Sequence, residues 1–402
     1  MINAFTTFMA FATLASATEL IVGTDAADVQ ATLDLAKPGD VVVLPEGRWP
    51  GPARVDKTLT LTSRGGVLVG TVGQTLIVEA PGAIIASLVV EGSGDELRGP
   101  DACAFVAGTA TGAVIRDSRF TDCLFGIWVN EVEEVRLLNN VVIGRPEERP
   151  PSKGNGIHLF DSKRLEVRGN RVEGARDGIY VSATHDSIIA ENRVSNQRYG
   201  IHYMYSYSNQ IIGNVANHNS GGIALMQSRD LKVVDNVASD NERQGILFRD
   251  ALDSEIRGNT VERNGEGMFF FSSVRNEISG NVVGGNQIGA RIWAGTVDNN
   301  IHNNAFVANR VQIFYVASED QTWGSNYWSD YQGWDQDDDG LGDRPYRNAA
   351  FTARLLHRYP QAVLLLSSPT LELLSHLQAR LPALRVPSII DPAPLINRTG
   401  IE

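Results

Sequence analysis

Apolar and polar residues alternate in short runs along most of the chain, and the runs return about every 22 residues. In the segment Gly200–Met204, Ile201 and Tyr203 would face one side of a strand. His202 and Met204 would then face the other side. The positions equivalent to Ile201 are almost all large and apolar, which indicates a column that faces a core. These positions are Ile127, Ile157, Ile179, Ile201, Ile223, Ile246, Met268, Ala290 and Ile313.

Asparagines recur in phase with this apolar column. One series is Asn140, Asn170, Asn192, Asn214, Asn236, Asn259, Asn281, Asn304 and Asn326, and a second is Asn196, Asn219, Asn241, Asn264, Asn286 and Asn309. Internal repeats of this length indicate stacked units that share one core, and the leucine signature of leucine-rich repeats is missing. The pattern therefore favours a parallel β-helix, in which the asparagines form hydrogen-bonded ladders at the inner turns and have a structural role.

We therefore expect an all-β protein, a right-handed parallel β-helix (solenoid) of about ten turns, with the hand that parallel crossovers usually take. Residues 61–326 form the β-helix in this prediction. Residues 18–60 form an N-terminal cap and the first turn, because Ala26–Ala36 has the pattern of a short amphipathic helix. A short helical and extended tail at residues 360–402 ends the chain.

The N-terminus and the overall charge bear on location and partners. Residues 1–17 are apolar and end in Ala15-Ser16-Ala17, the small-residue pattern of a cleavage site, so they resemble a secretory signal peptide. No Lys or Arg precedes the apolar stretch, which departs from the usual signal. The net charge of −12 argues against a nucleic-acid partner, which would require a basic surface.

Two local features depart from the repeat. Cys103 and Cys123 are 20 residues apart, close to one turn but not equal to it, so we expect a buried pair of thiols, with a disulfide as the alternative. Eight extra residues between Asn140 and Asn170, within Arg145–Lys153, should form a loop that projects from the solenoid wall. Such loops often carry function, and a tolerated insertion is the alternative.

After Asn326 the repeat gives way to an acidic segment, residues 327–359. Carboxylates at loop positions 1, 3, 5 and 9, with glycine at position 6, match the first part of a calcium-binding loop. Tyr346 stands where the final bidentate glutamate would be. We expect a structural calcium site, with an acidic solvated turn as the alternative. The carboxylates are Asp335, Asp337, Asp339 and Asp343.

The tail carries an apolar stripe. A helix with Ser368 as N-cap and Pro369 in its first turn would place five leucines on one face, and a proline-rich extended arm follows. The stripe could simply cap the open end of the solenoid. We favour the alternative that the tail docks onto a partner. The leucines are Leu371, Leu373, Leu374, Leu377 and Leu381.

Three segments resemble the NosD family: Gly-Ile-His-Tyr-Met-Tyr-Ser at Gly200–Ser206, the run that begins Asn-Tyr-Trp-Ser-Asp-Tyr at Asn326–Asp343, and the ending Ser388–Leu395. The resemblance covers nearly the whole chain. It implies a periplasmic β-helix protein of nitrous oxide reductase maturation, held at the inner membrane by a membrane ABC transporter (permease and ATPase). It also implies that the protein delivers copper to nitrous oxide reductase or assembles its copper clusters, with a copper chaperone as a further partner.

The main alternative is a protein that acts on or binds carbohydrate. Lyases and hydrolases need carboxylates on the exposed strand face, and the two outward columns contain neither Asp nor Glu, so we expect no enzyme. Their aromatic residues could stack on sugar rings, so a non-catalytic carbohydrate-binding protein stays open, as does a purely structural solenoid. The columns are Trp128, His158, Tyr180, His202, Ala224, Leu247, Phe269 and Arg291, and Asn130, Phe160, Ser182, Met204, Met226, Arg249, Phe271 and Trp293.

The outward columns also predict a copper(I) site. His202 and Met204 leave the same strand face, and Met226 follows Met204 by one repeat. Thioether and imidazole ligands suit Cu(I) and suit calcium or magnesium poorly. His158 is a weaker fourth candidate. The alternative is an apolar protein-docking patch that would also include Phe160, Phe269 and Phe271.

Overall fold

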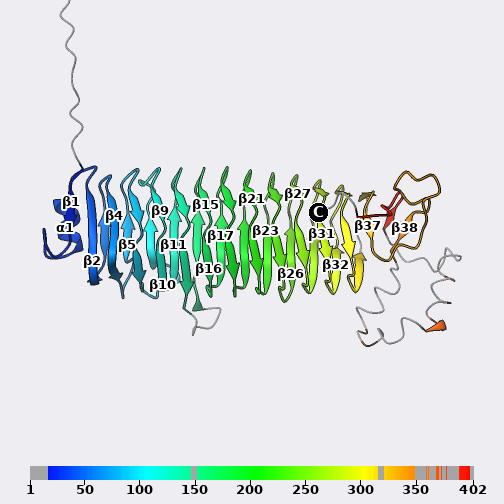
Figure 1. Cartoon of the computed structure of the whole chain (residues 1–402), viewed down its shortest axis with the longest axis horizontal. Helices are drawn as coiled ribbons and strands as arrows, with labels where there is room; N and C mark the ends of the chain where they lie inside the picture. The colour runs from blue at the N-terminus through cyan, green and yellow to red at the C-terminus, as the bar shows by residue number, and fades with distance from the viewer. Residues whose placement is uncertain are drawn as a thin grey trace, which may run out of the picture.

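The computed structural model describes residues 17–145, 152–315, 321–348 and 389–398, together with isolated positions between 359 and 377. The chain winds into an elongated solenoid whose turns stack along one axis, from α1 at one end to β37 near the other (Figure 1). Every strand pairing along the solenoid is parallel, as between β20 and β23. The predicted parallel β-helix is therefore confirmed.

Two sheets form the wall of the solenoid. The larger sheet has 25 strands, from β1 (Glu19–Ile21) to β37 (Tyr327–Trp328), and a typical turn contributes two of them, such as β21 (Gln210–Ile212) and β22 (Val215–Asn217). The smaller sheet has 12 strands, and the solenoid has about 14 turns, which is more than the repeat pattern predicted. The reason is that residues 53–106 also fold into turns of this sheet, although their sequence lacks a clear repeat. Its strands are β3 (Ala53–Val55), β5 (Leu76–Val78), β8 (Ala102–Val106), β11 (Phe125–Asn130), β14 (Ile157–Phe160), β17 (Asp177–Ser182), β20 (Tyr199–Met204), β23 (Gly221–Met226), β26 (Gln244–Arg249), β29 (Glu266–Phe271), β32 (Ile288–Ile292) and β35 (Val311–Tyr315).

The asparagine ladder is built as predicted. The backbone N–H of Asn192 and its side-chain Nδ2 both donate to Oδ1 of Asn214, over 3.0 and 2.9 Å. Nδ2 of Asn214 donates in turn to the carbonyl oxygen of Ile189 over 2.8 Å. Each ladder asparagine from Asn140 to Asn326 is buried, so the ladder satisfies backbone groups that water cannot reach.

The second ladder begins at a different residue from the one predicted. Gln197, not Asn196, donates its backbone N–H to Oδ1 of Asn219, over 3.1 Å. Asn196 is exposed and has φ of 60°, the left-handed conformation of a corner residue. The longer glutamine side chain still reaches the carbonyl of Val172, so the ladder continues without an asparagine.

A disulfide joins Cys103 and Cys123, so the expectation of two thiols was wrong. Cys103 lies in β8 of the smaller sheet, and Cys123 ends β10 (Arg119–Cys123) of the larger sheet. A separation slightly shorter than one turn therefore brings a residue within β8 next to the end of β10 in the following turn, and the Cα atoms are 5.5 Å apart.

A helix covers the N-terminal end. α1 (Val29–Leu35) lies inside the segment expected to be helical, and Asp28 caps it by accepting the backbone N–H of Ala31 over 2.8 Å. Val29 and Leu33 are buried against the first turn. No helix in the described part of the chain is long and apolar enough to cross a membrane.

The end of the predicted arm packs on the other end of the solenoid. β39 (Ile390–Asp391) pairs antiparallel with β38 (Tyr346–Arg347). Asp391 is fully buried, and its Oδ2 accepts hydrogen bonds from the backbone N–H and Nδ2 of Asn326 and from Nε1 of Trp328. Asp391 thus takes the place that the next ladder asparagine would have. This part of the arm completes the fold, and docking of the tail onto a partner stays a prediction.

Three predicted features lie wholly or partly outside the described residues. They are the signal peptide up to residue 16, the loop at 146–151 and most of the apolar stripe in the tail. Arg145, at the start of the loop, is held at the wall by an ion pair with Asp95 and by donating to the carbonyl of Ser93 over 3.0 Å.

Candidate metal site

The residues predicted to bind copper lie on the outer face of the smaller sheet. In β20, Ile201 and Tyr203 are fully buried in the core, so His202 and Met204 leave the strand on the opposite face. The parallel register of β20 and β23 sets Met204 directly beside Met226. Because adjacent strands are about 4.8 Å apart, the two thioether side chains are neighbours.

His202 is buried although it points outward. Only 6% of its surface is exposed, because the rings of Tyr180 and Tyr199 pack against the imidazole with centroids 5.1 and 4.9 Å away. Met204 and Met226 are partly exposed. The predicted site is therefore layered, with the imidazole beneath a cover of tyrosines and the thioethers nearer to solvent.

A buried carboxylate holds the imidazole. Asp177, at the start of β17, has an Oδ2 atom 2.9 Å from Nδ1 of His202. Arg198 donates from Nε and Nη2 to the two oxygens of the same carboxylate, over 2.8 and 2.6 Å. The Asp177 side chain is 1% exposed. Burial alone would raise its pKa, but the hydrogen bonds from His202 and Arg198 outweigh burial and hold the pKa below its usual value.

The other ring nitrogen of His202 has no hydrogen-bond partner among the described residues. Its Nε2 is fully covered from solvent. A buried polar atom without a partner is destabilising and requires an explanation, such as an ion or ligand that binds there. This atom belongs to a residue on the same sheet face as Met204 and Met226, and it is the strongest structural indication of a metal ligand in the site.

His158 fits the ligand set poorly. It lies in β14, two strands away from His202, which separates the two backbones by about 9.6 Å, with Tyr180 in the strand between them. Its ring stacks on Trp128, with centroids 4.1 Å apart. Burial lowers its pKa to about 4, so it is neutral at ordinary pH. His158 is therefore the weaker of the two histidine candidates, and its role as a ligand stays a prediction.

The sequence analysis did not identify the acidic side chains on the outer face of the smaller sheet. The two columns considered contain no carboxylate. Asp177 and Glu266 stand two residues before the inward column, and their contacts with His202 and Arg291 place them on the outer face. Each is paired with an arginine: Asp177 with Arg198, and Glu266 with Nε of Arg291 over 2.6 Å. The sequence gives little signal for this column, because the same position is Tyr199 and Gly221 in the next two turns.

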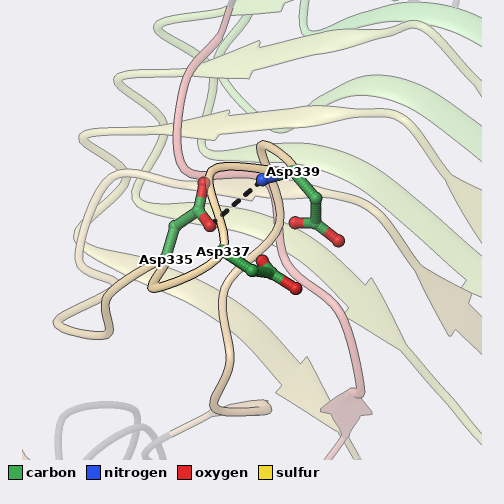
Figure 2. Close-up of side chains that lie close together, drawn as sticks. All are labelled: Asp335, Asp337 and Asp339. Atoms are coloured by element: carbon green, nitrogen blue, oxygen red, sulfur yellow. Dashed lines mark hydrogen bonds between the residues drawn. The ribbon is translucent and has the colours of Figure 1, made fainter.

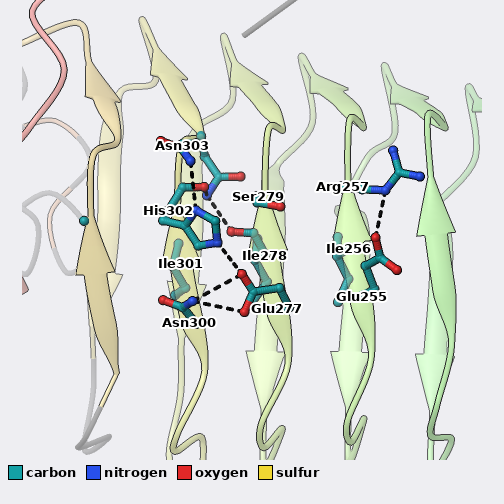
Figure 3. A network of polar contacts seen from close by, with 12 residues as sticks. Glu255, Ile256, Arg257, Glu277, Ile278, Ser279, Asn300, Ile301, His302 and Asn303 are labelled. Carbon is teal, nitrogen blue, oxygen red and sulfur yellow. Dashed lines mark hydrogen bonds and ion pairs between the residues drawn. The ribbon is translucent and has the colours of Figure 1, made fainter. Parts of the chain in front are cut away.

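A second histidine–carboxylate contact, on the larger sheet, has a different character. Figure 3 shows His302 and Asn300 of β33 (Asn300–His302) directed at Glu277 of β30 (Glu277–Ser279). Asn300 donates to Glu277 over 3.0 Å. The side chains of His302 and Glu277 are 30% and 47% exposed, so water shares the contact. This is a solvated surface network, whereas the contact between Asp177 and His202 is dry.

The acidic loop gathers three of its four predicted ligands. One carboxylate oxygen from each of Asp335, Asp337 and Asp339 lies within 4.8 Å of the others (Figure 2). The negative charge of Asp339 raises the pKa of Asp337, as expected for crowded carboxylates without a cation. Asp343 is not part of the group and accepts the backbone N–H of Gln336 over 2.8 Å. Calcium binding stays a prediction.

Two comparisons relate the chain to known sequences. Residues 144–333 match the family model described as "Periplasmic copper-binding protein (NosD)". The chain is 38% identical over 379 residues to the probable ABC transporter binding protein NosD of Pseudomonas aeruginosa, and the match covers 89% of each chain. It is 34% identical over 375 residues to the protein of the same name from Stutzerimonas stutzeri, covering 88% of this chain and 86% of that one.

Solved structures share the fold at low sequence identity. The A-module of the Azotobacter vinelandii mannuronan C-5 epimerase AlgE6 matches with a TM-score of 0.54 and 15% identity, over 76% of this chain and 90% of that one. The family 28 exopolygalacturonase of Yersinia enterocolitica has a TM-score of 0.58 and 11% identity, over 76% and 78%. The Streptococcus pneumoniae surface adhesin PfbA has a TM-score of 0.58 and 13% identity, over 76% and 93%. At these identities the likeness concerns the fold alone.

Proposed function

The chain belongs to the NosD family, and we propose that it is a periplasmic accessory protein that carries copper(I) as cargo. It works with a membrane ABC transporter, and it delivers copper to nitrous oxide reductase or assembles the copper clusters of that enzyme. The description of the family and the names of its relatives support the copper and transporter parts of this proposal. The reductase is the partner that the sequence resemblance implied.

The observation that carries the proposal is the unpartnered Nε2 of His202, on the sheet face that also carries the adjacent Met204 and Met226. One imidazole and two thioethers form a soft donor set, which suits Cu(I) and not the hard cations that prefer oxygen. Met204 is two residues from His202 on the same face, which places their Cα atoms about 7 Å apart, and Met226 is its neighbour on the next strand. Long, flexible methionine side chains can span such distances.

The layered arrangement suggests how cargo would move. Met204 and Met226 are partly exposed and His202 is buried, so a partner that docks on this face would reach the thioethers first. Metal ligands of the partner would then replace the two thioethers one at a time, while His202 still holds the copper ion. Phe160, which is 37% exposed, and the partly buried Phe271 provide apolar surface on the same face for such a partner.

A Cu(I) competition titration against a chromogenic chelator tests the site. We expect the metal-free parent to withdraw one Cu(I) from the chelator, and a variant with His202→Ala, Met204→Ala and Met226→Ala to lose that capacity. Met268→Leu is the matched control, because Met268 belongs to the inward column and is 1% exposed. A triple variant that binds Cu(I) as tightly as the parent would disprove the site.

One observation favours carbohydrate binding as a second candidate. Trp128, His158 and Tyr180 form a continuous column of rings on the same face, and such columns stack on sugar rings. Titration of neutral and uronic-acid oligosaccharides, followed by tryptophan fluorescence, tests this function. Saturable binding that is lost in Trp128→Ala would favour it over copper handling.

A further inference from the structure

We propose that Asp177 is a positioning residue that fixes the tautomer and orientation of His202, so that Nε2 is the atom presented to the cargo ion; this inference rests on the proposed function. Asp177 itself would not touch the ion. It would act through the imidazole, from the neighbouring strand β17.

The hydrogen bond between the two side chains determines where the proton lies. An ionised carboxylate can only accept hydrogen bonds, and Oδ2 of Asp177 is 2.9 Å from Nδ1 of His202. Nη2 of Arg198 also lies 3.4 Å from Nδ1, but the carboxylate oxygen is closer, so the contact with Asp177 places the proton on Nδ1. A neutral imidazole has only one N–H, so the lone pair lies on Nε2, the nitrogen that has no partner within the described structure.

Asp177 is itself held rigidly. Both of its oxygens accept from Arg198, whose guanidinium lies over the ring of Tyr199 at 5.1 Å. The arginine also balances the charge of the buried carboxylate, which would otherwise be costly to bury. The imidazole of His202 thus faces a neutral ion pair with a fixed geometry. Partners of this kind orient metal-binding histidines in many sites, and their loss lowers metal affinity about 10–100-fold.

His158 provides an internal contrast in the same column. Nδ2 of Asn155 lies 3.3 Å from Nδ1 of His158. An amide nitrogen can only donate, so Nδ1 of His158 accepts and the proton lies on Nε2. The two histidines therefore have opposite tautomers, and Nε2 carries a free lone pair only in the histidine that contacts Asp177.

The substitution Asp177→Asn should reverse the tautomer of His202. The remaining carbonyl oxygen would accept from Arg198, and the amide NH₂ would turn toward Nδ1 of His202. Nδ1 would then accept a hydrogen bond and the proton would move to Nε2, which removes the lone pair from the binding position. We expect a 10–100-fold loss of Cu(I) affinity, in line with other lost partners of metal-binding histidines.

Nitrogen-15 NMR of the imidazoles in the metal-free, full-length protein measures the tautomers directly. We expect the proton on Nδ1 of His202 in the parent and on Nε2 in Asp177→Asn. A parent with the proton on Nε2 of His202 would overturn the inference without any variant. So would an Asp177→Asn protein whose tautomer and Cu(I) affinity match the parent.

The same titrations separate this inference from the proposed function. If His202→Ala binds Cu(I) as well as the parent, the copper site itself is wrong and the inference falls with it. If His202→Ala loses binding and Asp177→Asn does not, only the inference fails. Asp240→Asn is the control, because Asp240 also pairs with an arginine, Arg263, but at the surface, and both measurements should stay at parent values.

Discussion

Replacing Asp391 by alanine should open the C-terminal end of the solenoid and leave its middle intact. One oxygen of Asp391 accepts three hydrogen bonds, from the backbone and side chain of Asn326 and from the indole of Trp328, over 2.9, 3.0 and 3.1 Å. All three residues are buried. Alanine would leave the three donors without an acceptor at the position where the ladder ends.

The expected cost follows from those three bonds. A buried donor that loses its partner costs roughly 1–3 kcal/mol, so the last turn should lose about 3–5 kcal/mol, after allowance for water that enters from the open end. Turns of a solenoid contact only their neighbours, so the loss stays local. Amide exchange in β36 (Thr322–Gly324) and β37 should therefore accelerate at least about a hundredfold.

Hydrogen–deuterium exchange read by mass spectrometry tests this prediction. Asp391→Asn is the matched control, because its amide oxygen can accept the same three donors, as a ladder asparagine does. We expect parent-like exchange in Asp391→Asn, fast exchange at Thr322–Trp328 in Asp391→Ala, and unchanged exchange in β20 in both. Equal exchange in the alanine variant and the parent would refute the idea that Asp391 completes the ladder.

The result also determines how a docking role of the tail should be tested. Deletion from Tyr359 onward would remove Asp391 together with the apolar stripe, so loss of partner binding would have two causes. Leu373 and Leu377 are 60% and 37% exposed and do not belong to the ladder. Leu373→Asp with Leu377→Asp should abolish co-purification with the transporter while exchange at the last turn stays normal. Co-purification that persists in this variant would contradict docking through the stripe.

Three further predictions concern single residues. Because burial lowers the pKa of His158 to about 4 in the fold, and the unfolded chain keeps about 6.5, stability should fall as pH decreases from about 6.5 to about 4. Urea unfolding should show this loss in the parent and not in His158→Gln. Asn214→Ala removes the acceptor of two buried N–H donors of Asn192, so the free energy of unfolding measured in urea should fall by roughly 2–4 kcal/mol. An unchanged free energy of unfolding would show that the ladder is not needed for stability. Calcium should bind the acidic loop in isothermal titration and bind weakly or not at all after Asp337→Asn; equal binding would place calcium elsewhere.

The fold could be predicted because a solenoid repeats its physical requirements once per turn. Columns of isoleucine and asparagine carry the same information many times, so single exceptions do not obscure them. The errors occurred at the corners, where a turn can gain or lose a residue without disturbing the columns. Gln197 replaced the expected Asn196 in this way, and the disulfide joins Cys103 of β8 to Cys123 at the end of β10, a spacing that differs from the repeat.

Only part of the candidate site could be predicted from the sequence: the histidine and methionines, but not the carboxylate that contacts the histidine. Alternation along β20 fixes the face of His202 and Met204, and the repeat fixes the neighbour of Met204. The partner of His202 lies 25 residues away on a diagonal of the sheet, which neither periodicity describes. The column of Asp177 is itself irregular, since other turns have Tyr199, Gly221 and Glu266 there. What marks Asp177 is that its charge is buried, which the stacking of the turns does not require. The search for function should therefore begin at such exceptions.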